Sequence, residues 1–424
     1  MKVLIVNTSE RAGGAAVAAH RLMEALSNNG VKARMLVRDK QTDDLQVVDL
    51  PGKLRAKWCF LWERFVIFLH LHFSKVNLFS LDIANVGNDI TRLPEFRDAD
   101  VVHLHWVNQG MLSTDGIRRI LRSGKPVVWT MHDIWPAVSI CHLTLDCRNF
   151  TTGCRQCPYL PGGGSSRDLA ARVWRRKQRM LDGQNITFVA CSRWLEGEAK
   201  SSALLHGQIV TSIPNPIDTR VFRPASQAEA RLSEQLPQDL HLLLFVCQRV
   251  TNPYKGMNYL VDACRQLASQ YPEMLENTGV VILGEDADEV ASLLPFKSFA
   301  LGYVSDERHI ARIYNAVDLF VLPSLSENLP NTIMEAMACG VPSVGFKVGG
   351  IPEEIDHRRN GYVAAYRDAD DLARGIRWTL FEADREALRS ECLRKVAQNY
   401  SPSSVAVRYV EVYQQAIAHK HFKL

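Results

Sequence analysis

The sequence lacks several features that would assign it to common classes of protein. No apolar run reaches the ~20 residues that a membrane-spanning helix needs. The formal net charge is only +4, which gives little support to a nucleic-acid-binding protein. There is no solenoid-type repeat and no low-complexity tract, which argues against repeat architectures and disordered segments. Ten cysteines in 424 residues do not indicate a secreted disulfide framework.

The composition is that of a globular protein, and the length of the chain predicts two domains. The chain is 46% hydrophobic and 23% charged, and its length exceeds that of one ordinary hydrophobic core. Three prolines in Ile213–Pro224, "IPNPIDTRVFRP", mark a linker. We therefore predict a first domain over residues 1–215, a second over residues 216–401, and a C-terminal helix over residues 402–424 that can pack back on the first domain.

Strands and helices alternate in both domains. In the first, "KVLIVN", "VKARMLV", "DVVHLHW", "KPVVWTMHD" and "NITFVACS" are predicted strands; in the second they are "HLLLFVCQR", "GVVILGE", "DLFVLPS" and "PSVGF". This alternation predicts parallel sheets with helices on both faces, an α/β fold of two doubly wound domains. Such sheets bind ligands at the carboxyl ends of their strands, and we expect the site in the cleft between the domains. The start, "MKVLIVNTSE", predicts a strand and not a signal peptide.

Charge is distributed unevenly along the chain. Up to Asn215 there are 28 Lys+Arg and 19 Asp+Glu, and beyond it 22 and 27. A basic first half beside an acidic second half suggests that the first half meets something anionic, such as a lipid surface, a phosphate or a partner. One basic segment, Arg172–Met180, "RVWRRKQRM", is either a solvated helix face or a surface that attracts a lipid-linked phosphate or an anionic membrane.

The most apolar stretch is Trp58–Phe73, "WCFLWERFVIFLHLHF", which Glu63 and Arg64 interrupt. Two interpretations stay open. The segment is either a buried helix, or a helix that lies in the plane of a membrane. In the second case the basic residues just upstream would face anionic head groups; they are Lys53, Arg55 and Lys57.

A helix that begins between two glutamates is the strongest local signal. In "SLSENLPNTIMEAMACGVPSV", Pro330 suits a first helical position and Gly340 suits the position after the end. We predict a helix from Pro330 to Cys339. Its N-terminal amides, near Asn331 and Thr332, form an anion site. Glu327 before the helix and Glu335 inside it would then bind hydroxyl groups on the two ends of a sugar–diphosphate–ribose ligand; the alternative is a capped surface helix with solvated acids.

Other polar or flexible residues follow predicted strands and are candidates for the same site. Arg249 and Lys255, in "CQRVTNPYKG", follow the first strand of the second domain, where two cations can hold a diphosphate. Gly13 and Gly14 follow the first strand of the chain and allow close approach to a ligand. His132, in "TMHDIWP", ends another strand; a lone histidine is more often structural, but this position favours a role in the cleft.

Four cysteines cluster in "CHLTLDCRNFTTGCRQC". The last two form a C-x2-C pair after a glycine, which suits two thiolates on one metal ion. We predict a structural zinc site; the alternatives are reduced buried thiols, or disulfides in an oxidising compartment. The predicted ligands are Cys141, Cys147, Cys154 and Cys157.

These motifs together resemble a known family. The chain resembles the retaining, nucleotide-sugar-dependent glycosyltransferases of the two-domain GT-B fold, specifically glycosyltransferase family 4. The resemblance covers nearly the whole chain and rests on the Gly-Gly loop, "HDIWP", "NPID", "R…YKG" and the Glu-x7-Glu motif with "EAMACGVPSV". The cysteine segment and "HLHW" resemble a bacterial subgroup that builds colanic-acid-like exopolysaccharides. The family's common Gly-Phe-Gly-type run is replaced here by Asn328-Leu329-Pro330, which leaves the sugar undefined.

The resemblance implies a role for each candidate residue. Glu335 would hold the ribose hydroxyls, and Glu327 would contact the donor sugar. Arg249 and Lys255 would stabilise the leaving diphosphate, with the amides near Asn331. In the first domain, Gly14 would lie beside the phosphates, and His132 would bond the sugar near the reacting carbon.

The implied reaction is transfer of a sugar from a nucleotide diphosphate to an acceptor hydroxyl with retained configuration and no catalytic metal. The implied partners are a nucleotide-sugar donor and a glycan or lipid-linked acceptor, for a protein of the cytoplasm or the inner membrane face. The alternative within this fold is a sugar-nucleotide epimerase. A zinc-dependent nucleic-acid module and a dinucleotide-binding oxidoreductase fit less well, because basic-aromatic interleaving and G-x-G-x-x-G are absent.

Overall fold

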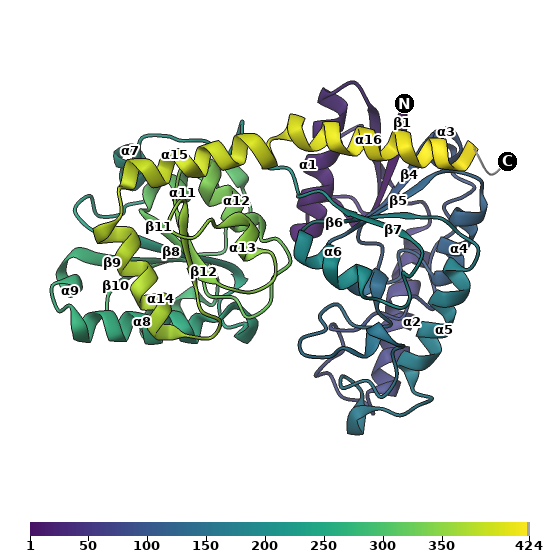
Figure 1. The fold of residues 1–424 in the computed structure, drawn as a ribbon, viewed down its shortest axis with the longest axis horizontal. Helices are drawn as coiled ribbons and strands as arrows, with labels where there is room; N and C mark the ends of the chain where they lie inside the picture. The colour runs from purple at the N-terminus through teal and green to yellow at the C-terminus, as the bar shows by residue number, and fades with distance from the viewer. Residues whose placement is uncertain (422–424) are drawn as a thin grey trace. The chain divides into compact units, whose positions relative to one another are not determined.

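The computed structural model describes residues 1–421, which form two compact units. The first unit comprises Met1–Pro216 and the last helix from Val405 onward, and the second comprises Ile217–Ser404. Each is described by itself (Figure 1). The break at Pro216 falls inside the proline-rich segment that the sequence marks as a linker.

The first unit contains a seven-stranded, all-parallel sheet in the order β3-β2-β1-β4-β5-β6-β7. Its strands are β1 (Lys2–Ser9), β2 (Lys32–Asp39), β3 (Val47–Asp49), β4 (Val101–Leu104), β5 (Val127–Met131), β6 (Thr187–Ala190) and β7 (Ile209–Ser212). Its helices are α1 (Gly14–Asn28), α2 (Lys53–His70), α3 (Pro94–Asp98), α4 (Thr114–Arg122), α5 (Leu169–Leu181) and α6 (Arg193–Lys200).

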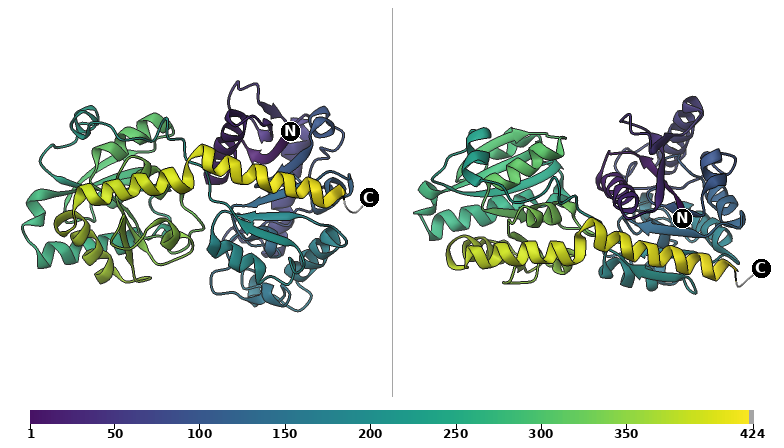
Figure 2. Two further views of the ribbon diagram at one scale, coloured as in Figure 1. Left: turned by 45° about the horizontal axis from the view of Figure 1, so that its top comes forward. Right: turned by 90° about the horizontal axis from the view of Figure 1, so that it is seen from above.

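Helices cover both faces of this sheet because its side chains alternate between two apolar clusters. Val3 and Ile5 face the cluster that contains α1 and the last helix, α16 (Pro402–His421). Leu4 and Val6 face the cluster that contains α2, α4, α5 and α6. Figures 1 and 2 show α16 running along the first unit's sheet. Such two-sided burial is typical of parallel sheets.

The second unit contains a six-stranded, all-parallel sheet in the order β10-β9-β8-β11-β12-β13. Its strands are β8 (His241–Arg249), β9 (Thr278–Glu285), β10 (Lys297–Gly302), β11 (Leu319–Leu322), β12 (Ser343–Phe346) and β13 (Gly361–Ala364). Its helices are α7 (Gln227–Ser233), α8 (Met257–Gln270), α9 (Met274–Asn277), α10 (Ala287–Ala291), α11 (Glu307–Ala316), α12 (Asn331–Ala338), α13 (Ile351–Glu354), α14 (Ala369–Arg377) and α15 (Arg385–Lys395).

The strand order reverses once in each sheet, between β1 and β4 and between β8 and β11. At such a reversal, the loops after the two central strands turn to opposite faces and leave a crevice for a ligand. The loop after β1 carries Gly13, and the loop after β11 carries Glu327. The α/β fold class predicted from the alternation of strands and helices is therefore confirmed, and the sheets bring the predicted motifs to their switch points.

Candidate active site

In the second unit, the loops after β8 and β11 are joined by an ion pair. Lys255 Nζ lies 2.6 Å from Glu327 Oε1. The backbone beside Lys255 needs glycine, since Gly256 has φ +72° and a Cβ there would lie 1.9 Å from the carbonyl oxygen of Pro323. The "YKG" sequence thus sets the lysine against the end of β11.

This ion pair keeps Lys255 charged while leaving it room to bind a ligand. Burial lowers the pKa of Lys255, but the adjacent Glu327 carboxylate more than offsets this effect, so that the pKa lies above its ordinary value. The side chains remain 32% and 13% exposed. An ammonium group has three hydrogens to donate, so Lys255 can bind a second anion without releasing Glu327.

Helix α12 begins beside this pair, one residue later than predicted. Pro330 has the extended ψ of an N-cap, and the first helical residue is Asn331. The helix ends at Ala338, one residue earlier than predicted, and Gly340 lies just beyond the end with φ +80°, as expected. Asn331 and Thr332 form the first turn, where N–H groups lack intrahelical acceptors. Glu335, in the second turn, is 8% exposed, and the Tyr314 hydroxyl donates to its Oε2 at 3.4 Å.

A second glycine loop packs on the backbone of Glu327. Gly349 has φ +55°, and a Cβ there would lie 1.6 Å from the carbonyl oxygen of Glu327. The Gly-Gly pair before α13 therefore fixes the direction of the Glu327 loop. The same segment carries a residue that sequence reasoning missed, Glu354, which is fully buried with no hydrogen-bond partner for either oxygen within the described residues. Burial, together with the charge of Glu327, raises the pKa of Glu354 well above its ordinary value.

Arg249 does not join this group. It is the last residue of β8, the strand that precedes Lys255, but its guanidinium lies 3.4 Å from both Glu285 and Asp286. Its side chain is 63% exposed, and exposed pairs of this length are weak. Arg249 can therefore change partners when a stronger anion binds.

In the first unit, the predicted Gly-Gly loop lies at the switch point. Gly13 is the N-cap of α1 with φ +91°, and Gly14 is the first residue of that helix. A Cβ on Gly13 would meet nothing within 4 Å, so the glycine is required by its conformation while the space beside it stays open to a ligand.

His132 follows β5 and belongs to a row of imidazoles. Its Nε2 lies 2.9 Å from Nδ1 of His105, and its Nδ1 lies 3.6 Å from Sγ of Cys191. Burial lowers the pKa of His132 to about 4, against an opposing effect of Asp133. The ring is thus neutral at pH 7 and suited to hydrogen bonding. His105 was missed, although the alternating histidines of "HLHW" place His103 and His105 on one face of a strand.

Sequence reasoning also missed Asp133, which follows His132 in "HDIWP". Its Oδ2 accepts hydrogen bonds from Trp106 Nε1 at 2.9 Å and from His142 Nδ1 at 2.8 Å. His142 Nε2 lies 2.9 Å from Oδ2 of the fully buried Asp82. Burial lowers the pKa of His142, but the two carboxylates raise it to about 10. A histidinium therefore joins two aspartates that are 51 residues apart in the chain.

The four clustered cysteines line one cavity of about 20 Å³, the size of one water molecule. Burial raises the pKa of Cys154 to about 12 and that of Cys157 to about 11. The fully buried Lys177 ammonium lies close enough to oppose the shifts at Cys141 and Cys154. As positioned, no three His, Cys, Asp or Glu side chains in the described part of the chain are grouped as a metal site. The zinc site stays a prediction.

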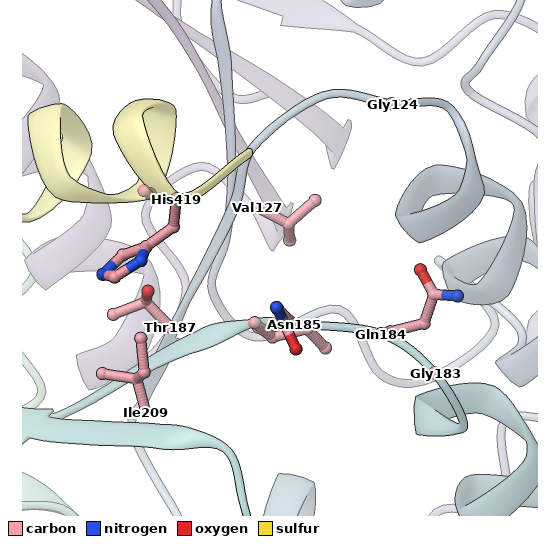
Figure 3. A pocket seen from close by; sticks show the side chains of 10 residues that line it. Gly124, Val127, Gly183, Gln184, Asn185, Thr187, Ile209 and His419 are labelled. Atoms are coloured by element: carbon pink, nitrogen blue, oxygen red, sulfur yellow. The ribbon is translucent and has the colours of Figure 1, made fainter. Parts of the chain in front are cut away.

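A larger pocket of about 220 Å³ opens at the other edge of the first unit's sheet (Figure 3). Val127, Thr187 and Ile209, which line it, are the first residues of β5, β6 and β7. His419 of α16 also lines it. Because ligands of doubly wound sheets bind at the carboxyl edge, this pocket is not part of the candidate site.

The chain is similar to known proteins over both units. A family model described as Glycosyltransferase Family 4 matches residues 12–221, and one described as Glycosyl transferases group 1 matches residues 241–381. The chain is 30% identical to a D-inositol 3-phosphate glycosyltransferase of Catenulispora acidiphila over 50% of this chain and 51% of that protein. It is 30% identical to the amylovoran biosynthesis glycosyltransferase AmsK of Erwinia amylovora over 37% and 39% of the two chains.

Among solved structures, HepE of Anabaena in complex with UDP has a TM-score of 0.63 at 15% identity, over 98% of this chain and 100% of HepE. That likeness shows the fold. The match spans about half of the first of these two relatives and 39% of the second. Since the two family models together cover most of both units, the chain belongs to the family 4 glycosyltransferases of the GT-B fold.

Proposed function

We propose that the chain is a retaining glycosyltransferase that moves a sugar from a nucleotide diphosphate sugar to a hydroxyl group of a glycan acceptor. The observation that carries the proposal is the Lys255–Glu327 pair at the start of α12, with Glu335 in the second turn of that helix. A cation and helix amides suit a diphosphate, and a carboxylate on each side suits a diol. HepE, which shares the fold, was solved in complex with UDP, and this supports a nucleotide-bound donor.

In this account the second unit binds the donor. Glu335 accepts hydrogen bonds from the ribose hydroxyls, and Glu327 does so from hydroxyls of the transferred sugar. Lys255 donates to the diphosphate, whose negative charge grows as the sugar leaves. The first-turn amides of Asn331 and Thr332 face the same charge. Arg249 joins them by leaving its weak partners Glu285 and Asp286.

The first unit supplies two further groups. Gly14 lets the backbone approach the donor phosphates, and neutral His132 bonds a sugar hydroxyl near the reacting carbon. The departing phosphate accepts the proton of the acceptor hydroxyl as that oxygen attacks the same face of the sugar. The configuration is thereby retained, and this step needs no metal ion, because the chain's own cations stabilise the leaving group.

The proposal extends to the acceptor and the setting. A lipid-linked glycan in bacterial surface polysaccharide synthesis is supported by the resemblance of the cysteine segment and by similarity to AmsK, whose name records amylovoran biosynthesis. Such a reaction would take place in the cytoplasm, at the inner face of the plasma membrane.

The test is product analysis. The chain is incubated with UDP-, GDP- and ADP-linked sugars, with and without a mixture of glycan acceptors, and release of nucleoside diphosphate and the anomeric form of the product are measured. We expect acceptor-dependent release with one donor and a product of unchanged configuration. An inverted product would refute the retaining mechanism. Conversion of the donor to an epimer without any acceptor would instead favour the epimerase.

A further inference from the structure

Helix α2 turns two charged side chains inward and several large aromatic side chains outward, the reverse of what is expected of a surface helix. Glu63 is fully buried, and Arg64 is 6% exposed. Trp58, Trp62 and Phe65, in contrast, are 54%, 41% and 49% exposed. The two charges that interrupt the apolar run in the sequence thus turn inward, and the aromatic rings turn outward.

The inward charges hold the segment that follows the helix. Glu63 Oε1 accepts the backbone N–H groups of Ile83 and Ala84 at 2.9 and 2.6 Å. Arg64 donates to the carbonyl oxygen of Leu78 and to Oδ1 of Asp82, each at 2.7 Å. These contacts fix the rotation of the helix about its axis, so the exposure of its apolar side is built into the fold.

The outward face is continuous. Its side chains have spacings of i, i+4, i+7, i+8, i+11 and i+15, which form one stripe along a helix. Two of its indole rings stack with their centroids 5.7 Å apart. More exposed apolar side chains follow in the next loop. The apolar face is Leu54, Trp58, Leu61, Trp62, Phe65 and Leu69, extended by Phe73, Val76 and Phe79.

The exposed charges within the stretch that forms this apolar face are all positive, although Lys53 pairs with Asp49, just before the helix, at 2.7 Å. Between Asp49 and Asp82 the only acidic residue is Glu63, which is buried. The exposed charged residues of this stretch are Lys53, Arg55, Lys57 and Lys75. On the same face of the sheet, α5 adds three exposed arginines at Arg172, Arg175 and Arg179.

We propose that the apolar face of α2 docks on an anionic lipid membrane, with the helix lying in the plane of the surface. No helix in the described part of the chain is long and apolar enough to cross a bilayer. A stripe of tryptophan, phenylalanine and leucine with basic neighbours matches a helix that enters only the head-group boundary. The positive flank selects lipid over a second copy of the same face, since two such faces would bring like charges together. This surface does not rest on the proposed glycosyl transfer.

The test is flotation of the full chain with two kinds of vesicle, phosphatidylcholine alone and phosphatidylcholine with about one third phosphatidylglycerol. We expect the wild type to float mainly with the anionic vesicles. Replacing Trp58, Trp62 and Phe65 by serine is expected to lower the partition coefficient about tenfold or more. The matched control replaces three exposed leucines of the same unit by serine, and it should float like the wild type; these are Leu45, Leu143 and Leu145.

A charge variant tests the choice of lipid. Lys57→Glu with Lys75→Glu should lower binding to anionic vesicles about tenfold or more and leave binding to neutral vesicles unchanged. Because all the replaced side chains are exposed, each variant should melt like the wild type, and that is measured first. The proposal is overturned if the wild type floats with neither vesicle, or if the aromatic variant floats as well as the wild type. Self-association that the aromatic variant abolishes, without flotation, would assign the face to a second copy and also overturn it.

Discussion

Lys255 and Glu327 in the second unit, and His142 with Asp82 and Asp133 in the first, are two ways to place charges near the carboxyl edge of a parallel sheet. Lys255 meets one carboxylate and stays partly exposed. His142 meets two, and it uses both ring nitrogens to do so. A cationic side chain that still has free N–H groups can bind a ligand. A cationic side chain whose N–H groups all have partners within the protein stabilises the fold instead. This difference supports the proposal that the first cluster binds the nucleotide sugar, and it indicates that the second cluster supports the "HDIWP" loop.

The largest loss of stability should come from breaking the cluster of His142, Asp82 and Asp133. His142→Ala leaves Asp82 and Asp133 without their shared cation and should cost about 3–5 kcal/mol of unfolding free energy. Chemical denaturation measures it, and His206→Ala, at an exposed histidine of the same unit, is the control. A loss below about 1 kcal/mol would contradict the role of His142 as a brace.

The pH dependence of that stability follows from the raised pKa. Because the pKa of His142 is about 10 in the folded chain and ordinary when unfolded, the folded state binds the extra proton. The stabilisation should be complete below pH ~6.5 and be lost as pH rises toward about 10. His142→Ala should remove this slope from the wild-type curve.

Lys255→Ala should lower turnover about 10²–10³-fold, because it removes a cation from the leaving diphosphate. Stability should change little, since the pair is partly exposed. Lys297→Ala, at an exposed lysine of the same unit, should behave like the wild type. If Lys255→Ala turns over at the wild-type rate, the spare donors of Lys255 have no function in catalysis, and the contrast between the two clusters fails.

The four clustered cysteines would form a second site in the first unit whose polar groups are all used internally, if they bind a zinc ion. If a zinc ion binds there, purified protein should carry one zinc per chain by elemental analysis. Cys157→Ser should abolish it and cost about 2 kcal/mol of stability. Cys59→Ser, at a buried cysteine outside the cluster, should keep the metal. Substoichiometric zinc and iron in the wild type would contradict the prediction.

The smallest effect concerns Glu354. Its raised pKa means that the folded chain holds a proton which the unfolded chain has released, so stability falls as pH rises above ~4.5. Glu354→Gln should be similar to the wild type at pH 4 and more stable than the wild type at pH 8, and the difference between their stabilities should widen as the pH rises. Parallel melting curves across this range would show that Glu354 does not titrate in the folded chain.

Sequence reasoning found the central strands and the loops that follow them, because long apolar runs and the turns after them are local signals. It missed β3, β7, β10 and β13, which are the four edge strands. Edge strands are short or half-exposed, so their apolar pattern is weak. The positions of Glu327 and Lys255 in loops after strands, and of Glu335 inside a helix, could be predicted because proline and glycine mark the ends of these elements.

His142 and Glu354 could not be predicted, because their environment depends on packing. His142 meets Asp82 across 60 residues, and no local pattern encodes such a contact. Glu354 looks like an ordinary acid in "PEEI" and is buried only because of the way α13 packs in the second unit. The outward aromatic face of α2 is a similar case, since the sequence shows that charges interrupt the run but not which way they turn.

The central claim is that α12 and its flanking carboxylates bind a nucleotide diphosphate. The most direct measurement is thermal stability of the wild type and of Glu335→Ala against UDP, GDP, ADP, their sugars and NAD, with Glu289→Ala at an exposed site as control. A ligand at 100 times its dissociation constant adds about 2.7 kcal/mol. We expect one nucleotide to stabilise the wild type and the control, and to stabilise Glu335→Ala much less. Stabilisation by NAD alone, or by no ligand, would contradict the claim.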